Sequence, residues 1–123
     1  MILVDTSIWV DHFRVEDDRL STLLGSRSVL MHPCVLGELA LGGLRDRMGI
    51  LTDLAKLPPA LEASHEETLR LIDAAVLYGK GIGYVDAQLL ASVRLTPGAR
   101  LWTRDRRLME AARTLDVAAV LDH

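Results

Sequence analysis

Four carboxylates in this sequence have apolar residues or glycine, and no basic residue, three and four positions away: Asp5, Glu38, Asp86 and Asp105. Asp46, Glu62 and Asp122 also lack a basic residue at these spacings, but they lie beside glycines, prolines or the terminus, where exposure is easy. Residues at those spacings share one face of a helix, so these acids project from apolar stripes. An ionised carboxylate on a buried face costs several kcal/mol unless it is paired or binds a metal. We therefore expect the four acids to share one site, in which a hard divalent cation, Mg²⁺ or Mn²⁺, supplies the counter-charge.

Each of these acids also has a more ordinary interpretation when it is taken singly. Asp5 and Asp105 stand at junctions between a strand and a helix, where aspartate commonly caps the helix. Asp86 lies near a helix start, where the helix dipole favours negative charge. Glu38 lies within a helix, so neither reason applies to it, although its long side chain could reach solvent.

Short β-rich runs alternate with longer helical segments along the chain. The hydrophobic pattern predicts strands at 2–4, 29–31, 60–63, 101–102 and 117–121, and helices at 7–14, 20–24, 33–41, 45–54, 64–78, 84–95 and 105–115. Such alternation requires crossover connections, so we expect an α/β fold, a three-layer α/β/α sandwich around a mostly parallel sheet of about five strands. Ligands of such sheets bind outside the carboxyl ends of the strands, where Asp5 and Asp105 are placed.

The composition is that of one globular domain spanning residues 1–123, with 50% hydrophobic residues but only 4% aromatic ones. The sequence has neither an apolar run long enough to span a membrane nor a signal-peptide pattern, so we expect a cytoplasmic protein without membrane contact. The single cysteine, Cys34, and four scattered histidines give no zinc-binding spacing. Any metal must then be held by oxygen.

The net charge of −3 argues against nucleic-acid binding, but the charges are unevenly distributed. Between residues 94 and 113 there are six arginines and only two acids. A solvated helix face is the commoner meaning of such a run. Contacts with nucleic-acid phosphates are the alternative, and Arg104, Arg106 and Arg107 are the candidates for them.

Four segments resemble motifs of the PIN-domain family in order and approximate spacing: ILVDTSIWVD, GELALGGL, GYVDAQLLA and LWTRDRRL. The length is similar to that of the VapC-type toxins within this family. The resemblance implies a compact α/β/α sandwich whose acidic Mg²⁺ or Mn²⁺ site is formed by Asp5, Glu38, Asp86 and Asp105. It also implies cleavage of RNA (tRNA, rRNA or mRNA), a small antitoxin protein as partner in a type II toxin–antitoxin pair, homodimers and hetero-oligomers with the antitoxin.

The chain departs from the family pattern after Asp105. Leu108 stands in place of a frequent phenylalanine, and arginine replaces a further acid sometimes found beside the fourth one. This departure leaves open the role of the fourth acid and whether one or two metal ions bind. Asp5 and Asp86 are the preferred direct ligands, and Glu38 and Asp105 complete the set directly or through water.

Three hydroxyl side chains lie next to the acids in sequence: Thr6, Ser7 and Thr103. Each either caps a helix or orients a carboxylate from behind. The sequence alone does not separate these two roles.

Two other functions are compatible with a small α/β domain. A receiver-type phosphoacceptor domain needs a pair of acids after the first strand and a lysine after a late strand. Here Asp5 stands alone, and the only lysines, Lys56 and Lys80, precede the strand predicted at 101–102. A catalytically silent PIN-like interaction module is the second alternative, and the intact set of four acids argues against it.

Overall fold

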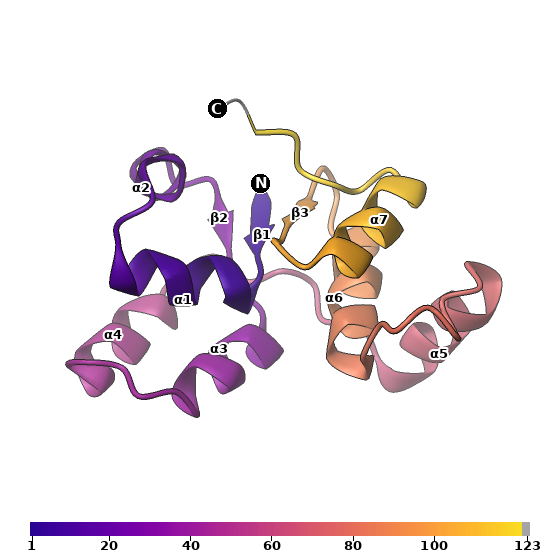
Figure 1. Cartoon of the computed structure of the whole chain (residues 1–123), viewed down its shortest axis with the longest axis horizontal. Coiled ribbons are helices and arrows are strands. Elements are labelled where there is room, and N and C mark those ends of the chain that lie inside the picture. The colour runs from indigo at the N-terminus through magenta and orange to yellow at the C-terminus, as the bar shows by residue number, and fades with distance from the viewer. Residues whose placement is uncertain (122–123) are drawn as a thin grey trace.

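A computed structural model describes residues 1–121 of the chain (Figure 1), so Asp122 and His123 of the predicted domain lie outside the described residues. Within that range the protein is an α/β sandwich with a parallel sheet, as predicted. Its elements are, in chain order, β1 (Ile2–Val4), α1 (Thr6–Arg14), α2 (Asp18–Gly25), β2 (Val29–Leu30), α3 (Pro33–Ala40), α4 (Arg47–Leu54), α5 (His65–Ala74), α6 (Tyr84–Leu95), β3 (Arg100–Trp102) and α7 (Arg106–Thr114).

The sheet has the order β2-β1-β3, with both pairings parallel. Leu3 of β1 lies opposite Leu30 of β2 on one side and Leu101 of β3 on the other. Because β1 is central, the chain leaves it toward one neighbour and later returns beside its other edge. In such a sheet this reversal of strand order opens a crevice at the carboxyl ends of the strands. Asp5 is the residue that directly follows β1.

The expected count of about five strands is wrong, because among residues 1–121 the sheet contains three strands and two single bridges. The segment predicted at 60–63 forms no strand, and the nearest pairing is a single bridge between Met31 and Pro59, just before it. Proline has no N–H group, so consecutive prolines at 58 and 59 prevent a longer ladder. The segment at 117–121 contributes a bridge between Leu101 and Ala118. Val120 is 87% exposed, so no buried face continues this pairing.

The core is aliphatic, as the low aromatic content predicts, and α6 runs through it. All residues from 87 to 93 in α6 are buried, so this helix is covered on every side along that stretch. Burying one such leucine completely contributes roughly 1.5–3 kcal/mol. This packing fixes α6 in place, and with it the position of Asp86 in its first turn.

The ends of two helices show how local chemistry sets the boundaries. The predicted capping box of α5 is present, with Ser64 and Glu67 each bonded to the other's backbone N–H. The helix ends at Ala74, earlier than the predicted residue 78, because Val76 adopts a left-handed conformation (φ 51°). α3 begins at Pro33, and His32 accepts a hydrogen bond from the Cys34 N–H as its cap.

Within the described part of the chain, no helix is long and apolar enough to cross a membrane.

Candidate functional site

Asp5 lies at the carboxyl end of β1 with only 7% of its surface exposed. Its Oδ2 accepts hydrogen bonds from Thr103 Oγ1 (2.7 Å) and Ser7 Oγ (3.0 Å), and its Oδ1 accepts one from the Thr6 N–H (2.8 Å). Three donors, two from the start of α1 and one from the residue after β3, therefore hold this carboxylate in one orientation. Thr103 Oγ1 also accepts a bond from the Asp105 N–H (3.0 Å), so one hydroxyl links the first acid to the fourth.

Glu38 projects from α3 toward the same region. Its Oε1 accepts a hydrogen bond from Thr6 Oγ1 (2.7 Å), the residue next to Asp5. Glu38 is exposed, as is Asp105, which corrects the expectation that all four acids lie on buried faces. The apolar residues around these two acids pack inward, while the carboxylates themselves reach the surface.

Asp86 is half-buried in the first turn of α6, and its pKa is raised above the ordinary value. Burial is the largest cause, and the negative charge of Asp5 is the next. Asp105 and Glu38 raise the pKa further, while a backbone hydrogen bond at Gly83 lowers it. All three other acids thus lie close enough to Asp86 to repel its charge, so the structure brings the four together at one edge of the sheet.

Asp105 caps α7, because its Oδ1 accepts hydrogen bonds from the N–H groups of Arg107 (2.9 Å) and Leu108 (3.0 Å). Asp5 occupies the equivalent position at the start of α1. The capping interpretation is therefore confirmed for both residues. It does not exclude a second role, since Asp105 Oδ2 takes no part in the cap.

The four carboxylates form a negative cluster without a cationic partner, since within residues 1–121 no ion pair joins any of them to lysine or arginine. In the same part of the chain, no three acidic, histidine or cysteine side chains form a group that could hold a metal ion as they stand. The donor set is nevertheless all carboxylate oxygen. That chemistry fits a hard cation such as Mg²⁺, which keeps several water ligands and needs no closed protein cage.

Arg104, the first of the three predicted phosphate contacts, is occupied elsewhere. Its guanidinium forms ion pairs with Asp11 of α1 and with Asp17 at the start of α2, the latter at 2.8 Å. Its backbone N–H donates to Ser7 Oγ (3.3 Å). Two carboxylates already match its charge, which weakens the prediction that Arg104 contacts RNA. Sequence spacing gave no signal of this pairing, because the partners lie 93 and 87 residues away.

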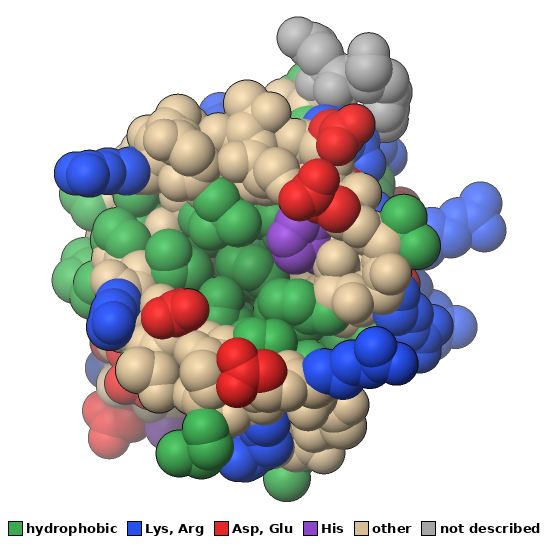
Figure 2. All heavy atoms as spheres, turned by 90° about the vertical axis from the view of Figure 1, so that its left-hand side faces the viewer, with side chains coloured by type: hydrophobic (Ala, Val, Ile, Leu, Met, Phe, Trp, Pro, Cys, Tyr) green, Lys and Arg blue, Asp and Glu red, His purple; other side chains and the backbone are tan. Residues whose placement is uncertain are grey.

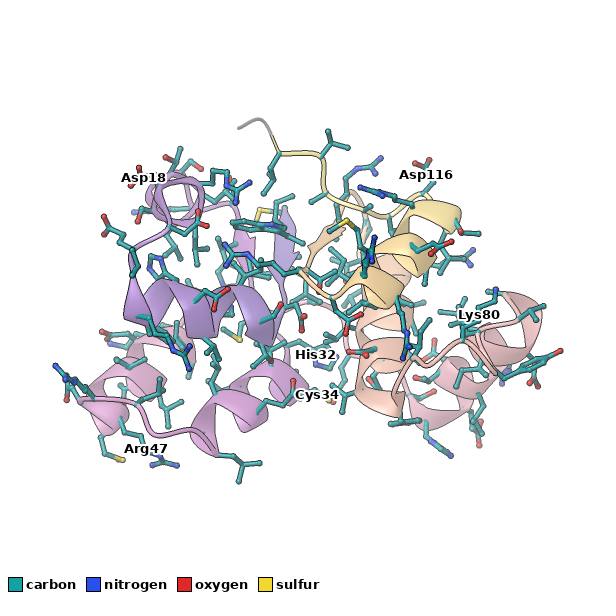
Figure 3. The ribbon with its side chains drawn as sticks, viewed as in Figure 1. Asp18, His32, Cys34, Arg47, Lys80 and Asp116 are labelled. Carbon is teal, nitrogen blue, oxygen red and sulfur yellow. The ribbon has the colours of Figure 1, made fainter. Side chains whose placement is uncertain are left out.

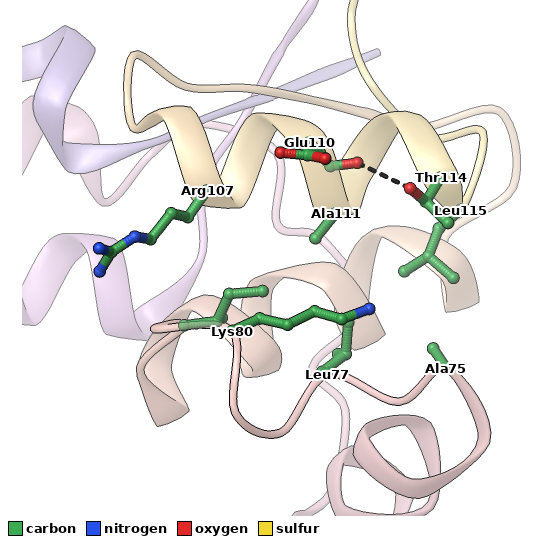
Figure 4. Close-up of a pocket in the computed structure, with 9 residues that line it drawn as sticks. Ala75, Leu77, Lys80, Arg107, Glu110, Ala111, Thr114 and Leu115 are labelled. Carbon is green, nitrogen blue, oxygen red and sulfur yellow. Dashed lines mark hydrogen bonds between the residues drawn. The ribbon is translucent and has the colours of Figure 1, made fainter.

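Arg106 and Arg107 are exposed in the first turn of α7. The Arg107 guanidinium lies against Gly81, where an added Cβ would collide with it, and Gly81 also has a left-handed backbone (φ 74°). Arg107 and Lys80 both line a cavity of about 350 Å³ between α7 and the loop before α6. In Figure 4 their side chains extend in opposite directions, so the two cations do not converge on one ligand.

A larger groove of about 590 Å³ borders the cluster on the side of Glu38. It lies among α1, α3 and α4, and Phe13, Leu39 and Ile50 contribute to its apolar lining, with Arg14 and Arg45 among its charged residues. Figure 2 shows hydrophobic side chains gathered in a hollow on this side of the molecule. An apolar surface of this kind beside the acids was not predicted, because its residues come from three separate helices and from the loop between α3 and α4.

Comparison with known proteins decides the family. The PIN-domain family model matches residues 2–114. The chain belongs to the PIN-domain family. This PIN domain is 50% identical over 118 residues to the proteins named ribonuclease VapC32 of Mycobacterium tuberculosis strains CDC 1551 / Oshkosh and ATCC 25618 / H37Rv, covering 96% of this chain and 95% of each relative.

Solved structures share the fold at lower identity. The structure of FitAB bound to an IR36 DNA fragment has a TM-score of 0.63 at 23% identity, covering 100% of this PIN domain and 99% of that chain. FitAcB from Neisseria gonorrhoeae has a TM-score of 0.60 at 22% identity, covering 96% and 95%. PAE2754 from Pyrobaculum aerophilum has a TM-score of 0.56 at 20% identity, covering 93% and 85%. At these identities the likeness concerns the fold alone.

Proposed function

We propose that this PIN domain is a metal-dependent endoribonuclease and the toxin of a type II toxin–antitoxin pair. The observation that carries the proposal is the convergence of Asp5, Glu38, Asp86 and Asp105 at the carboxyl edge of the sheet without a cationic partner. The 50% identity to ribonuclease VapC32 over nearly the whole chain supports RNA as the substrate.

The acids are suited to hold Mg²⁺ or Mn²⁺. Asp5 and Asp86 are the proposed direct ligands, because they are the least exposed of the four. Glu38 and Asp105 complete the set directly or through water. When bound, such an ion lowers the pKa of a water ligand and stabilises the charge that develops on a phosphodiester during hydrolysis.

The remaining residues orient this set and bind the substrate. Thr103 and Ser7 fix the Asp5 carboxylate, and Thr6 of α1 donates a hydrogen bond to Glu38 of α3. Removal of such outer contacts commonly lowers metal affinity or activity 10- to 100-fold. Arg106 and Arg107 are the proposed contacts to RNA phosphates, since neither takes part in an ion pair within residues 1–121.

The proposed partners are a small cognate antitoxin protein and a second copy of this chain, in the cytoplasm. The resemblance to VapC-type toxins supports both. Co-purification of the chain with the product of a small gene directly upstream tests the first, and the mass of the purified protein in solution tests the second.

The test of the activity compares wild type with Asp5→Asn and Glu38→Gln, and with Asp53→Asn as a matched control. Asp53 is an exposed acid on α4 whose partner is Lys56, outside the cluster. We expect wild type and the control to cut RNA with Mg²⁺ or Mn²⁺ and to stop growth when induced, and both site variants to lose at least about 100-fold in rate. Equal harmlessness of all four proteins, together with no cleavage by purified wild type, would contradict the proposal and favour a silent interaction module.

A further inference from the structure

His32 is a fully buried histidine at the junction between the two halves of the molecule. In Figures 1 and 3, α1 to α4 gather on one side and α5 to α7 on the other, with His32 between them. His32 Nδ1 accepts a hydrogen bond from the Cys34 N–H (3.0 Å), which caps α3. An acceptor at Nδ1 leaves the ring proton of the neutral imidazole on Nε2.

That proton is donated to Ser92, which lies 60 residues away in α6. The distance from His32 Nε2 to Ser92 Oγ is 2.9 Å, and both side chains are completely buried. Ser92 Oγ also accepts a bond from the Ala63 N–H (3.0 Å). Burial lowers the pKa of His32, so the neutral form required by this arrangement is the one present at neutral pH.

The positions of these residues relate the bond to the acid cluster. His32 stands six residues before Glu38, at the start of the helix that carries it, and Ser92 stands six residues after Asp86 on α6. Each acid therefore lies about 9 Å along a helix from one end of the bond. Each helix is continuous between its end of the bond and its acid, so a shift at the bond is expected to move one carboxylate relative to the other.

We propose that the His32–Ser92 hydrogen bond ties α3 to α6 and sets the separation of Glu38 from Asp86. His32 and Ser92 are then positioning residues for the acid site, and the inference rests on the proposed function of that site. If His32 had only a structural role, it would cap α3 and fill space in the core without affecting the acid site.

Two substitutions at one position separate these roles. His32→Asn keeps an acceptor at the place of Nδ1 and a good helix cap, but its side chain is too short to reach Ser92. His32→Gln keeps a donor at the place of Nε2 and loses the cap. Ser92→Ala removes the bond from the other side.

The kinetic test measures kcat and KM for RNA cleavage. We expect His32→Asn and Ser92→Ala to lower kcat about 10-fold with KM unchanged, and His32→Gln to stay closer to wild type. The double variant His32→Asn/Ser92→Ala should be no slower than the slower single variant, because both remove the same bond. Unchanged kcat in both single variants would overturn the proposal even if their melting temperatures fall.

A distance measurement tests the tie without any activity. Nitroxide labels at Leu41→Cys and Leu95→Cys, in a Cys34→Ala background, report the separation of α3 from α6, since both sites are exposed and lie at the ends of these helices. We expect the distance distribution to broaden or shift in His32→Asn and Ser92→Ala but not in Asp53→Asn. An unchanged distribution would overturn the tie, whereas a wild type that cuts no RNA would overturn only the proposed function.

Discussion

Asp86 is the residue at which function and stability oppose each other most directly. Burial and three neighbouring acids raise its pKa, so the folded state disfavours its ionised form. A group whose pKa is higher in the folded state than in the unfolded state binds its proton more tightly when folded. Its contribution to stability is therefore present at low pH and declines as the pH rises through the raised pKa.

Asp86→Asn should therefore stabilise the protein while abolishing RNA cleavage. The substitution removes the repelled charge at neutral pH, so its melting temperature should exceed that of wild type at pH 7. The difference should shrink as the pH falls toward the ordinary aspartate value, because wild type then also becomes neutral there. Thermal unfolding across that pH range is the measurement, with Asp53→Asn as the control.

As a proposed metal ligand, Asp86 should also set the pH dependence of activity. Metal binding needs the ionised carboxylate, so cleavage should fall with decreasing pH at a higher pH than an ordinary aspartate would cause. For the stability prediction, a melting temperature of Asp86→Asn at or below that of wild type at pH 7 would contradict the conclusion that burial and the neighbouring acids destabilise the ionised Asp86.

At the scale of elements, the sequence predicted the helices well because their signals are local. The capping box at Ser64 and the proline at the start of α3 are examples, and both are present. The strands predicted at 60–63 and 117–121 are wrong, because a short apolar run has the same sequence pattern whether or not it pairs along several residues. Whether a strand continues depends on its partner, as the single bridge at Ala118 shows.

The candidate site could be predicted to a similar extent as the helices. The four acids that the structure brings together are indicated by their apolar neighbours and by the family motifs, because those signals lie within a few residues of each acid. The exposure of Glu38 and the pairing of Arg104 with Asp11 and Asp17 depend on how distant helices pack. No local pattern encodes such contacts.

Arg104, directly before Asp105, and Arg107, two residues after it, should behave differently. Arg104→Ala removes the link from the loop after β3 to α1 and α2, and should cost about 0.5–1 kcal/mol of stability, as a partly exposed pair does. Arg107→Ala should leave stability nearly unchanged and raise KM for RNA, because it removes a proposed phosphate contact. It should also reduce the salt dependence of RNA binding by about one released counterion.

Denaturant unfolding and RNA binding at several salt concentrations measure both effects. Arg113→Ala, an exposed arginine at the far end of α7, is the control. A larger rise in KM for Arg104→Ala than for Arg107→Ala would reverse the assignment.

At the scale of the whole molecule, the acid cluster adds its repulsion to a net charge that is already negative. A ligand that binds only the folded state stabilises it by mass action. Mn²⁺ or Mg²⁺ at 100 times its dissociation constant should therefore add about 2.7 kcal/mol to the free energy of unfolding.

The response of the melting temperature to metal distinguishes binding at the acid cluster from general screening of charge. Wild type and Asp53→Asn should melt at higher temperature as Mn²⁺ is added, whereas Asp5→Asn and Asp86→Asn should respond much less, because each lacks a proposed ligand. Sodium chloride at matched ionic strength would act on all four proteins alike, since screening does not depend on one carboxylate. If Mn²⁺ raised the melting temperature of all four equally, its effect would be general and the acids would not form the metal site.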